Sequence, residues 1–226
     1  MSYNIYLSGG GSSQDTYQLD DIFLNSIGKR LLYIPVGLKR SFAGYDDCVK
    51  WFTDMVSSHN ISKEVSVWIN LKDKAKELKI SNFDAVYMGG ASDTLRLHNM
   101  LHKFNFYPQL RSFSKDGGII YGGSGGASVM GRTINYDQLD KRQLTVTETA
   151  ADLCGGYSIF THLNDKNQEI IERLEEGNVI AIPEGGGCLL DGEGKNVLYK
   201  GVSPAIMATS LSKINLGNNQ VYSMIR

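Results

Sequence analysis

Short apolar runs that end in glycine recur along the first half of this chain. Examples are NIYLSG, DAVYMGG and GGIIYGG, and segments with helical spacing such as YDDCVKWFTDMVSSH and SDTLRLHNMLHKF lie between the runs. Several runs are rich in β-branched residues and lack strict polar alternation, which is typical of strands covered on both faces. Strands that alternate with helices predict a mostly parallel sheet, and glycine-rich turns at strand ends mark the edge where open α/β sheets bind ligands.

The pattern changes after about residue 140. QLTVTET and GYSIFTHL have strand character, and residues 165–177 predict a helix that Asn164 or Asp165 caps and that ends at Gly177. Residues 179–200 predict short strands joined by glycine turns. The chain has 226 residues, of which 42% are hydrophobic, so we expect one domain over 1–226 with a single sizeable core.

Charge and composition exclude several classes of partner. With 23 basic and 24 acidic residues, the chain offers no charge excess for nucleic acid or an anionic membrane surface. The first residues do not resemble a secretory signal, and no run of 18 apolar residues could cross a bilayer, so we expect a cytoplasmic protein. The cysteines Cys48, Cys154 and Cys188 have no metal-binding spacing and are expected to be free thiols.

One serine stands among glycines directly after an apolar strand. Gly122-Gly123-Ser124-Gly125-Gly126 satisfies G-x-S-x-G, with the strand-like GGIIY before it and the helix-compatible ASVMG after it. A sharp strand-to-helix turn exposes the central hydroxyl only if its neighbours lack bulk. We therefore predict that Ser124 is a nucleophile, rather than part of a flexible turn or of a phosphate loop, which would lack its lysine.

Backbone amides close to this serine could stabilise an oxyanion. The Gly125 amide would lie beside the hydroxyl at the start of a helix, and Gly90, in the turn after the strand DAVYM, is the favoured second donor. In a non-catalytic module, LSGGGSSQD near the start of the chain and GGSGGA could instead form a nest of backbone amides for an anionic ligand.

A serine nucleophile needs a base, and His162 is the histidine that follows it in the chain. It ends the apolar run YSIF, and a histidine at a strand end in a parallel sheet would point to the same edge as the serine. His98 and His102 stand four residues apart but lack HExxH and a third ligand, so we interpret them as a helix face. No metal and no cofactor is expected.

Four segments together resemble peptidase family S51, the dipeptidase E and cyanophycinase family of serine peptidases. YGGSGGASVMG resembles its nucleophile elbow, YMGGASDTLRLHNML a strand with a glycine turn and helix, IFTHLND its histidine segment, and VIAIPEGGGCLL a later strand. The resemblance implies a flavodoxin-like α/β sheet, akin to class I glutamine amidotransferases, with helices on both faces. It also implies a nucleophile at Ser124, a base at His162 and oxyanion donors at Gly90 and Gly125.

The acid that would orient the histidine is the least determined member. The resemblance implies an aspartate between serine and histidine, and Asp140 fits best, 16 residues after Ser124 and 22 before His162. Asp137 is the close alternative, and a glutamate could substitute. Glu184, in the turn IPEGGG, could meet a substrate amino group, but it is expected to be a solvated turn acid outside the site.

Two departures from the family pattern affect specificity and rigidity. Gly125 stands where the family usually has alanine, a change expected to loosen the elbow. After His162, the segment Asp165-Lys166-Asn167-Gln168-Glu169-Ile170 has a lysine and no arginine, and only arginine makes the planar two-bond fork to a carboxylate. The second departure argues against aspartyl specificity.

The sequence thus predicts a serine exopeptidase or dipeptidase that hydrolyses short peptides through an acyl-enzyme. The partner is a short peptide, with no nucleic acid and no membrane, and a homodimer is compatible with the sequence. Two alternatives stay open. One is an α/β-hydrolase esterase, for which the 38 residues from Ser124 to His162 leave little room, and the other is an anion-binding glutamine amidotransferase-like module.

Overall fold

The computed structural model describes residues 3–38, 45–72, 79–91, 93–135, 148–169 and 177–224. Within these ranges an eight-stranded sheet has the order β12-β9-β8-β1-β5-β4-β2-β3. Its strands are β1 (Tyr3–Ser8), β2 (Arg30–Ile34), β3 (Glu64–Val67), β4 (Ala85–Met88), β5 (Ile119–Gly123), β8 (Gly187–Asp191), β9 (Asn196–Lys200) and β12 (Val221–Ser223). The neighbouring strands β1, β5, β4, β2 and β3 pair in parallel, whereas β8, β9 and β12 add antiparallel pairings.

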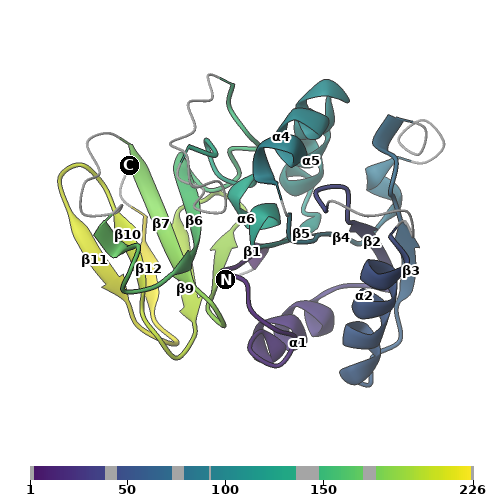
Figure 1. Ribbon diagram of the computed structural model, residues 1–226, viewed down its shortest axis with the longest axis horizontal. Helices are drawn as coiled ribbons and strands as arrows, with labels where there is room; N and C mark the ends of the chain where they lie inside the picture. Colours follow the sequence, from purple (N-terminus) through teal and green to yellow (C-terminus); the bar gives the residue numbers. More distant parts are fainter. Residues whose placement is uncertain are drawn as a thin grey trace.

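A second, four-stranded sheet lies beside β1 (Figure 1). It has the order β11-β10-β7-β6 and consists of β6 (Tyr157–Leu163), β7 (Asn178–Pro183), β10 (Ala205–Ala208) and β11 (Lys213–Leu216). The predicted strands after residue 178 are confirmed as β7, β8 and β9. The division of the strands between two sheets is not apparent from the sequence, because β7 and β8 are separated only by a short glycine turn.

Helices cover both faces of the large sheet, as predicted. In Figure 1, α1 (Tyr17–Ser26) and α2 (Asp46–Ser58) lie on one face, and α4 (Thr94–Lys103), α5 (Phe106–Lys115) and α6 (Gly125–Ser128) lie on the other. A 3₁₀ turn, η1 (Ile80–Asn82), precedes β4. Asp93 caps α4, since its side chain accepts a hydrogen bond from the Arg96 amide.

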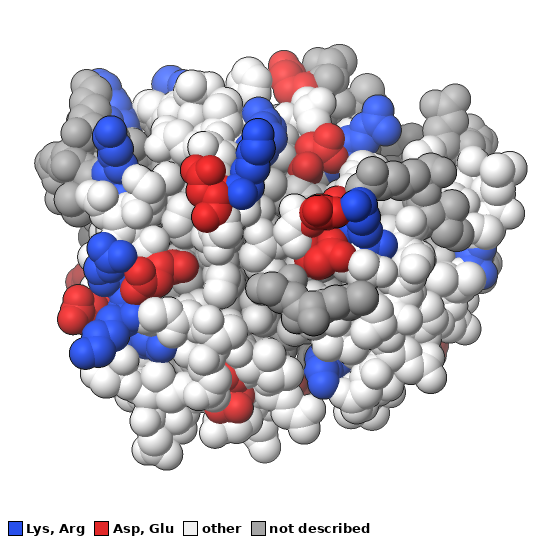
Figure 2. Space-filling view, turned by 180° about the vertical axis from the view of Figure 1, so that it is seen from behind, with Lys and Arg blue, Asp and Glu red and all other residues white. Residues whose placement is uncertain are grey.

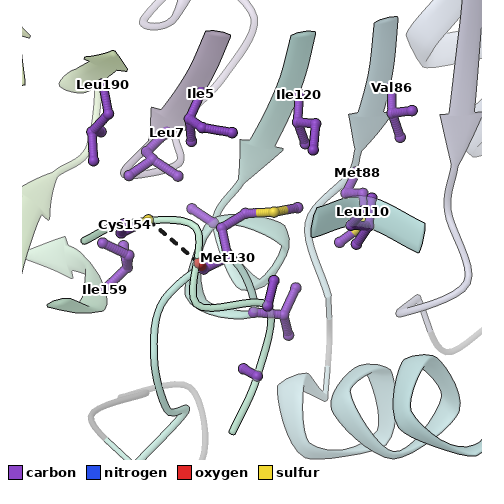
Figure 3. Packing of buried hydrophobic residues seen from close by; sticks show 14 of the residues in the cluster. Ile5, Leu7, Val86, Met88, Leu110, Ile120, Met130, Cys154, Ile159 and Leu190 are labelled. Carbon is purple, nitrogen blue, oxygen red and sulfur yellow. Dashed lines mark hydrogen bonds between the residues drawn. The ribbon is translucent and has the colours of Figure 1, made fainter. Parts of the chain in front are cut away.

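The core has one apolar layer under each set of helices. Successive strand residues alternate between the layers: Val86 and Met88 belong to the α4–α5 side, and Ala85 and Tyr87 to the α1–α2 side. Figure 3 shows the first layer, in which side chains of β1, β5, β4 and β8 meet Met130 and Leu110. This two-sided burial explains why the strand sequences lack polar alternation.

Two predicted elements fall partly outside the described residues. QLTVTET (143–149) lies mostly outside them, as do residues 170–176 of the predicted helix 165–177. The start of that helical segment is described, and there the amides of Asn167 and Gln168 donate to the Asn164 carbonyl.

The surface carries charges of both signs. On the face shown in Figure 2, acidic and basic side chains are interspersed, and the described atoms form no large field of one sign. Among the described residues, no helix has both the length and the apolar character that crossing a membrane requires.

Candidate active site

The turn from β5 into α6 holds Ser124 in a strained conformation. Its backbone has φ 51° and ψ −119°, a region that side-chain-bearing residues rarely adopt. The Ser124 amide donates to the Ser8 carbonyl of neighbouring β1 at 3.0 Å, and the Ser124 carbonyl accepts from the Ala127 amide at 2.8 Å. Hydrogen bonds on both sides of the residue therefore fix the elbow.

The glycines around Ser124 are required by close backbone approach. A Cβ on Gly122 would lie 2.6 Å from the Gly126 carbonyl oxygen, and one on Gly126 would lie 2.3 Å from the Met88 carbonyl oxygen. Such contacts are too short for any side chain, so β5, α6 and the end of β4 can meet only through glycine. The expectation that the elbow needs small residues is confirmed.

Gly125 does not leave the elbow loose. A Cβ on this residue would lie 2.6 Å from the Ala91 Cβ and 2.8 Å from the Thr94 Oγ1. The start of α4 thus fills the space that an alanine methyl would need. The predicted loosening is wrong, because the neighbouring helix compensates for the missing side chain.

His162 lies near the end of β6, in the second sheet, rather than in the sheet that carries Ser124. The pairing of β6 with β7 shifts register between Phe160 and Leu163, and His162 has φ 56°. The His162 amide donates to the Gly9 carbonyl at 3.0 Å, just beyond the end of β1. This bulge turns the imidazole across the junction of the two sheets, towards Ser124.

The carbonyl of His162 is held as firmly as its amide. The side-chain amides of Asn164 and Asn167 both donate to the His162 carbonyl oxygen, each at 2.9 Å. The backbone amide of Asn164 in turn donates to the Asn167 Oδ1 at 2.8 Å. Together these contacts stabilise a backbone conformation that an L-residue otherwise adopts at a cost.

The structure brings Ser124 and His162 into hydrogen-bond contact. Ser124 Oγ lies 2.6 Å from His162 Nε2. On its other side the ring packs against Gly10, where a Cβ would lie 2.4 Å from His162 Cε1. Gly10 (φ 97°) therefore leaves room for the imidazole, which gives the LSGGG turn a role in shaping the site.

Glu184 completes a chain of three side chains. Its Oε1 lies 2.7 Å from His162 Nδ1, although 62% of its side chain is exposed. The expectation that Glu184 is a merely solvated turn acid is therefore wrong. A carboxylate accepts only from a protonated nitrogen, so this contact favours the tautomer with hydrogen on Nδ1 and leaves Nε2 free to accept from Ser124.

The aspartates assigned from the sequence are not placed. Asp140, the predicted acid, and Asp137, its alternative, lie outside the described residues. Glu184 carried a signal that sequence analysis did not use, because it follows an apolar strand and precedes glycines, as Ser124 does. The contact between residues 162 and 184 arises because β6 and β7 are parallel neighbours, so their carboxyl ends lie together. The sequence does not show that these two strands pair.

Both glycines predicted as oxyanion donors lie next to Ser124. Gly90 is adjacent to the serine, since a Cβ on it would lie 3.7 Å from Ser124 Cβ. Gly125 is the first residue of α6, where the amide has no helical acceptor. Within the described part of the chain, neither amide donates to another backbone group.

Cavities lie on both sides of the histidine. One of about 500 Å³ is lined by Ser124, Gly90 and His162. The other, of about 600 Å³, is lined by His162 and Glu184 together with Asn164, Asp165 and Gln168. Both volumes fall in the range of small-ligand pockets.

Other reactive groups lie away from this chain of side chains. His98 is buried in α4 and its Nδ1 lies 2.9 Å from the Tyr107 hydroxyl, as expected of a structural residue. The cysteines are buried free thiols, and burial raises the pKa of Cys154 and of Cys188, which disfavours the reactive thiolate. Among the described residues, no group of three potential ligands could hold a metal ion.

Comparison with known proteins gives a consistent assignment. The sequence model of peptidase family S51 matches residues 5–198. A peptidase from an acI-B1 actinobacterium has a similar fold, with a TM-score of 0.73, 15% identity and coverage of 98% of this chain and 97% of that one. A Listeria monocytogenes EGD-e protein named as a peptidase E protein has a TM-score of 0.65 and 19% identity, and the match covers 89% of this chain and 99% of that chain.

One curated protein shares a shorter region. Cobyric acid synthase from Prochlorococcus marinus (strain MIT 9313) is 33% identical over 72 residues, which are 32% of this chain and 14% of that protein. The match is too short to carry an argument about activity.

Proposed function

Since the chain belongs to peptidase family S51, we propose that it is a serine peptidase of the exopeptidase or dipeptidase type, which hydrolyses short peptides through an acyl-enzyme. The observation that carries the proposal is the connected series Ser124 Oγ, His162 Nε2, His162 Nδ1 and Glu184 Oε1, with separations of 2.6 and 2.7 Å. These two contacts support the roles of nucleophile for Ser124, base for His162 and orienting acid for Glu184.

The first half of the reaction is acylation. His162 Nε2 accepts the Ser124 proton as the oxygen attacks the peptide carbonyl carbon, and the amides of Gly90 and Gly125 donate to the oxyanion. Glu184 stabilises the imidazolium that forms. When the tetrahedral intermediate collapses, the C–N bond breaks and His162 returns the proton to the leaving amine.

The second half is deacylation. Water enters from the side vacated by the amine, gives a proton to His162 Nε2 and attacks the ester carbonyl. Collapse of the second intermediate releases the carboxylic acid and restores the Ser124 hydroxyl. No residue beyond those named is needed for these proton transfers.

The size of the site supports short substrates. Each cavity beside His162 has room for a small ligand, about 500 and 600 Å³ respectively. We propose that the leaving amine occupies the cavity beside Glu184, because His162 must reach that nitrogen, and that the acyl part occupies the cavity beside Ser124.

A covalent probe provides the direct test. A fluorophosphonate should add once to the protein, at Ser124, and the adduct should be absent in Ser124→Ala. In a library of free dipeptides and tripeptides followed by mass spectrometry, Ser124→Ala should lower hydrolysis by at least about 10³-fold. Unchanged hydrolysis in this variant would reject the assignment.

Ser128→Ala is the matched control. Ser128 lies four residues further on, is fully buried, and its Oγ has no hydrogen-bond partner among the described residues. Removing an unpaired buried hydroxyl costs little. This variant should therefore keep both the adduct and the hydrolysis.

The two other functions considered from the sequence predict different outcomes. An α/β-hydrolase esterase would cleave esters without cleaving peptides. The match to family S51 argues against the α/β-hydrolase fold that this alternative requires. A non-catalytic anion-binding module would be stabilised by its ligand equally well in Ser124→Ala. The 2.6 Å contact between Ser124 and His162 favours catalysis over that module.

A further inference from the structure

One wall of the cavity beside Ser124 is aromatic. Tyr33, Tyr87 and Tyr121 stand on the adjacent strands β2, β4 and β5 at one level of the sheet, since Tyr33 pairs with Tyr87 and Tyr87 with Tyr121. All three line this cavity. Their ring centroids follow one another at 5.9 and 4.3 Å, so the rings form a continuous row beneath the nucleophile.

This row is rigid. The three rings are almost completely buried, and Phe52 of α2 stacks on Tyr33 with centroids 4.0 Å apart. A wall of packed rings offers dispersion contacts and little hydration to a ligand. It is therefore preorganised for an apolar group rather than for a charged one.

Trp51 places a further aromatic surface on the cavity. It lies one turn after Asp47 on α2, lines the same cavity, and leaves 42% of its surface exposed. Because Trp51 both lines the cavity and keeps part of its surface exposed, its ring is available for contact with a bound ligand. Leu38 adds an aliphatic contact to the lining.

The charge in this cavity has the wrong sign for an acidic side chain. Apart from His162, the charged group among the described lining residues is the carboxylate of Asp47, and no described lysine or arginine lines the cavity. Asp47 would repel a substrate carboxylate and attract a free amino group. A bidentate arginine, which carboxylate recognition favours, is absent from the described lining.

We infer that this cavity selects substrates in which the residue supplying the scissile carbonyl has a large apolar or aromatic side chain, and that Trp51 is a specificity-determining residue. The inference rests on the proposed function, because it assigns the cavity to the acyl side of the scissile bond. It concerns the side-chain class accepted there and not the mechanism of cleavage.

Five dipeptides with a common leaving residue test the inference: Phe-Gly, Leu-Gly, Ala-Gly, Asp-Gly and Lys-Gly. For the unmodified protein, kcat/KM for Phe-Gly and Leu-Gly should exceed the values for Ala-Gly, Asp-Gly and Lys-Gly by about tenfold or more. Equal rates across the series, or a preference for Asp-Gly, would overturn the inference.

Variants of Trp51 identify the source of the preference. Trp51→Ala should lower kcat/KM for Phe-Gly by about tenfold while changing that for Ala-Gly by less than twofold, and Trp51→Phe should restore most of the loss. Ile69→Ala is the control, since Ile69 is 50% exposed and does not line the cavity. A uniform loss over all five peptides in Trp51→Ala would overturn the assignment of this residue.

The fluorophosphonate adduct separates the two levels of the proposal. If Ser124 is labelled and any of the dipeptides is cleaved, a wrong side-chain preference rejects the inference alone. If Ser124 is not labelled and none is cleaved, the proposed function fails and the inference fails with it. Melting temperature and labelling, measured for each Trp51 variant, show that the variant is folded and has an intact nucleophile.

Discussion

At the scale of single residues, the site depends on two backbone conformations that L-residues avoid. Ser124 and His162 both have positive φ, 51° and 56°, and each is fixed by hydrogen bonds to the segment that ends β1: Ser124 to Ser8, and His162 to Gly9. The 2.6 Å contact between their side chains therefore depends on one short piece of the first strand. Strain of this kind persists only where neighbours over-determine it.

Glu184 should matter for rate more than for stability. In Glu184→Gln the imidazolium loses its negative partner, so we expect kcat to fall by about 10- to 100-fold with little change in KM. The loss should be smaller than that for a buried orienting acid, because solvent screens a side chain that is 62% exposed. Steady-state kinetics on the best dipeptide would measure both parameters.

Glu193→Gln is the comparison for this substitution. Glu193 is also an exposed glutamate in a turn after a strand, and it pairs with Lys195 rather than with the histidine. Its substitution should leave kcat within about twofold. An equal loss in both variants would show that Glu184 acts through general surface charge and not through His162.

At the scale of elements, the nucleophile is presented by three segments that approach closely at the glycines of the elbow. β5 runs into α6, α6 packs against α4, and the glycines of the elbow fill the contacts. α4 is itself anchored by its Asp93 cap, so the position of Ser124 is coupled to a helix that contributes no reacting group. Rigidity of the nucleophile is therefore a property of this packing.

Gly125→Ala should disturb that packing. The added methyl would lie 2.6 Å from the Ala91 Cβ, so α4 must shift, and overpacking of this kind costs about 1–3 kcal/mol of unfolding free energy. We expect a lower denaturant midpoint and a loss of kcat. The family's usual alanine at this place is thus expected to be harmful in this chain.

Gly123→Ala is the matched substitution, two residues earlier in the same elbow. A Cβ there would meet only ordinary contacts, with the Tyr87 hydroxyl 3.7 Å away. Chemical denaturation should show less than about 1 kcal/mol of change. If Gly125→Ala were equally mild, the close approach of α4 would not explain the glycine.

At the scale of the whole molecule, an acid is buried where α1 meets the sheet. Asp20 is 1% exposed, and its Oδ2 accepts a hydrogen bond from the Thr16 hydroxyl at 2.7 Å. Burial raises the pKa of Asp20, and the hydrogen bond from the Thr16 hydroxyl offsets part of the rise. Since Thr16 also lines the cavity beside Ser124, the acid lies directly behind that cavity.

The raised pKa of Asp20 predicts a dependence of stability on pH. Below the unfolded pKa of 3.8 both states hold the proton, and as pH rises the unfolded state loses it first. The native state then binds more protons, so this residue's contribution to stability falls until pH passes the folded pKa. Asp20→Asn, which cannot ionise, should lack this loss.

Thermal unfolding of both proteins between pH 4 and pH 8 would measure the effect. The melting temperature of Asp20→Asn relative to the unmodified protein should increase with pH over the range that begins near the unfolded pKa. Asp54→Asn provides the comparison, because Asp54 is an aspartate on α2 whose side chain is 63% exposed and pairs with Lys50. A difference that does not change with pH would reject an ionising, buried Asp20.

The sequence alone determined the elements that depend on local chemistry. The elbow at Ser124, the order of strands and helices and the glycine turns follow from periodicity and from residue size, which act over a few neighbouring positions. Tertiary structure decided the rest. Strands β6 and β7 belong to the second sheet and pair in parallel, which places Glu184 against His162. His162 in turn contacts Ser124.

That second set of facts depends on which strand ends become neighbours in space. Residues 8, 124, 162 and 184 lie far apart in the chain, and their contacts arise from the junction of two sheets rather than from any local pattern. Separation along the sequence carries no information about such a junction. An acid expected between Ser124 and His162 in the chain is therefore replaced in space by Glu184, which follows both. Local propensity fixes the elements, whereas packing between them fixes the site.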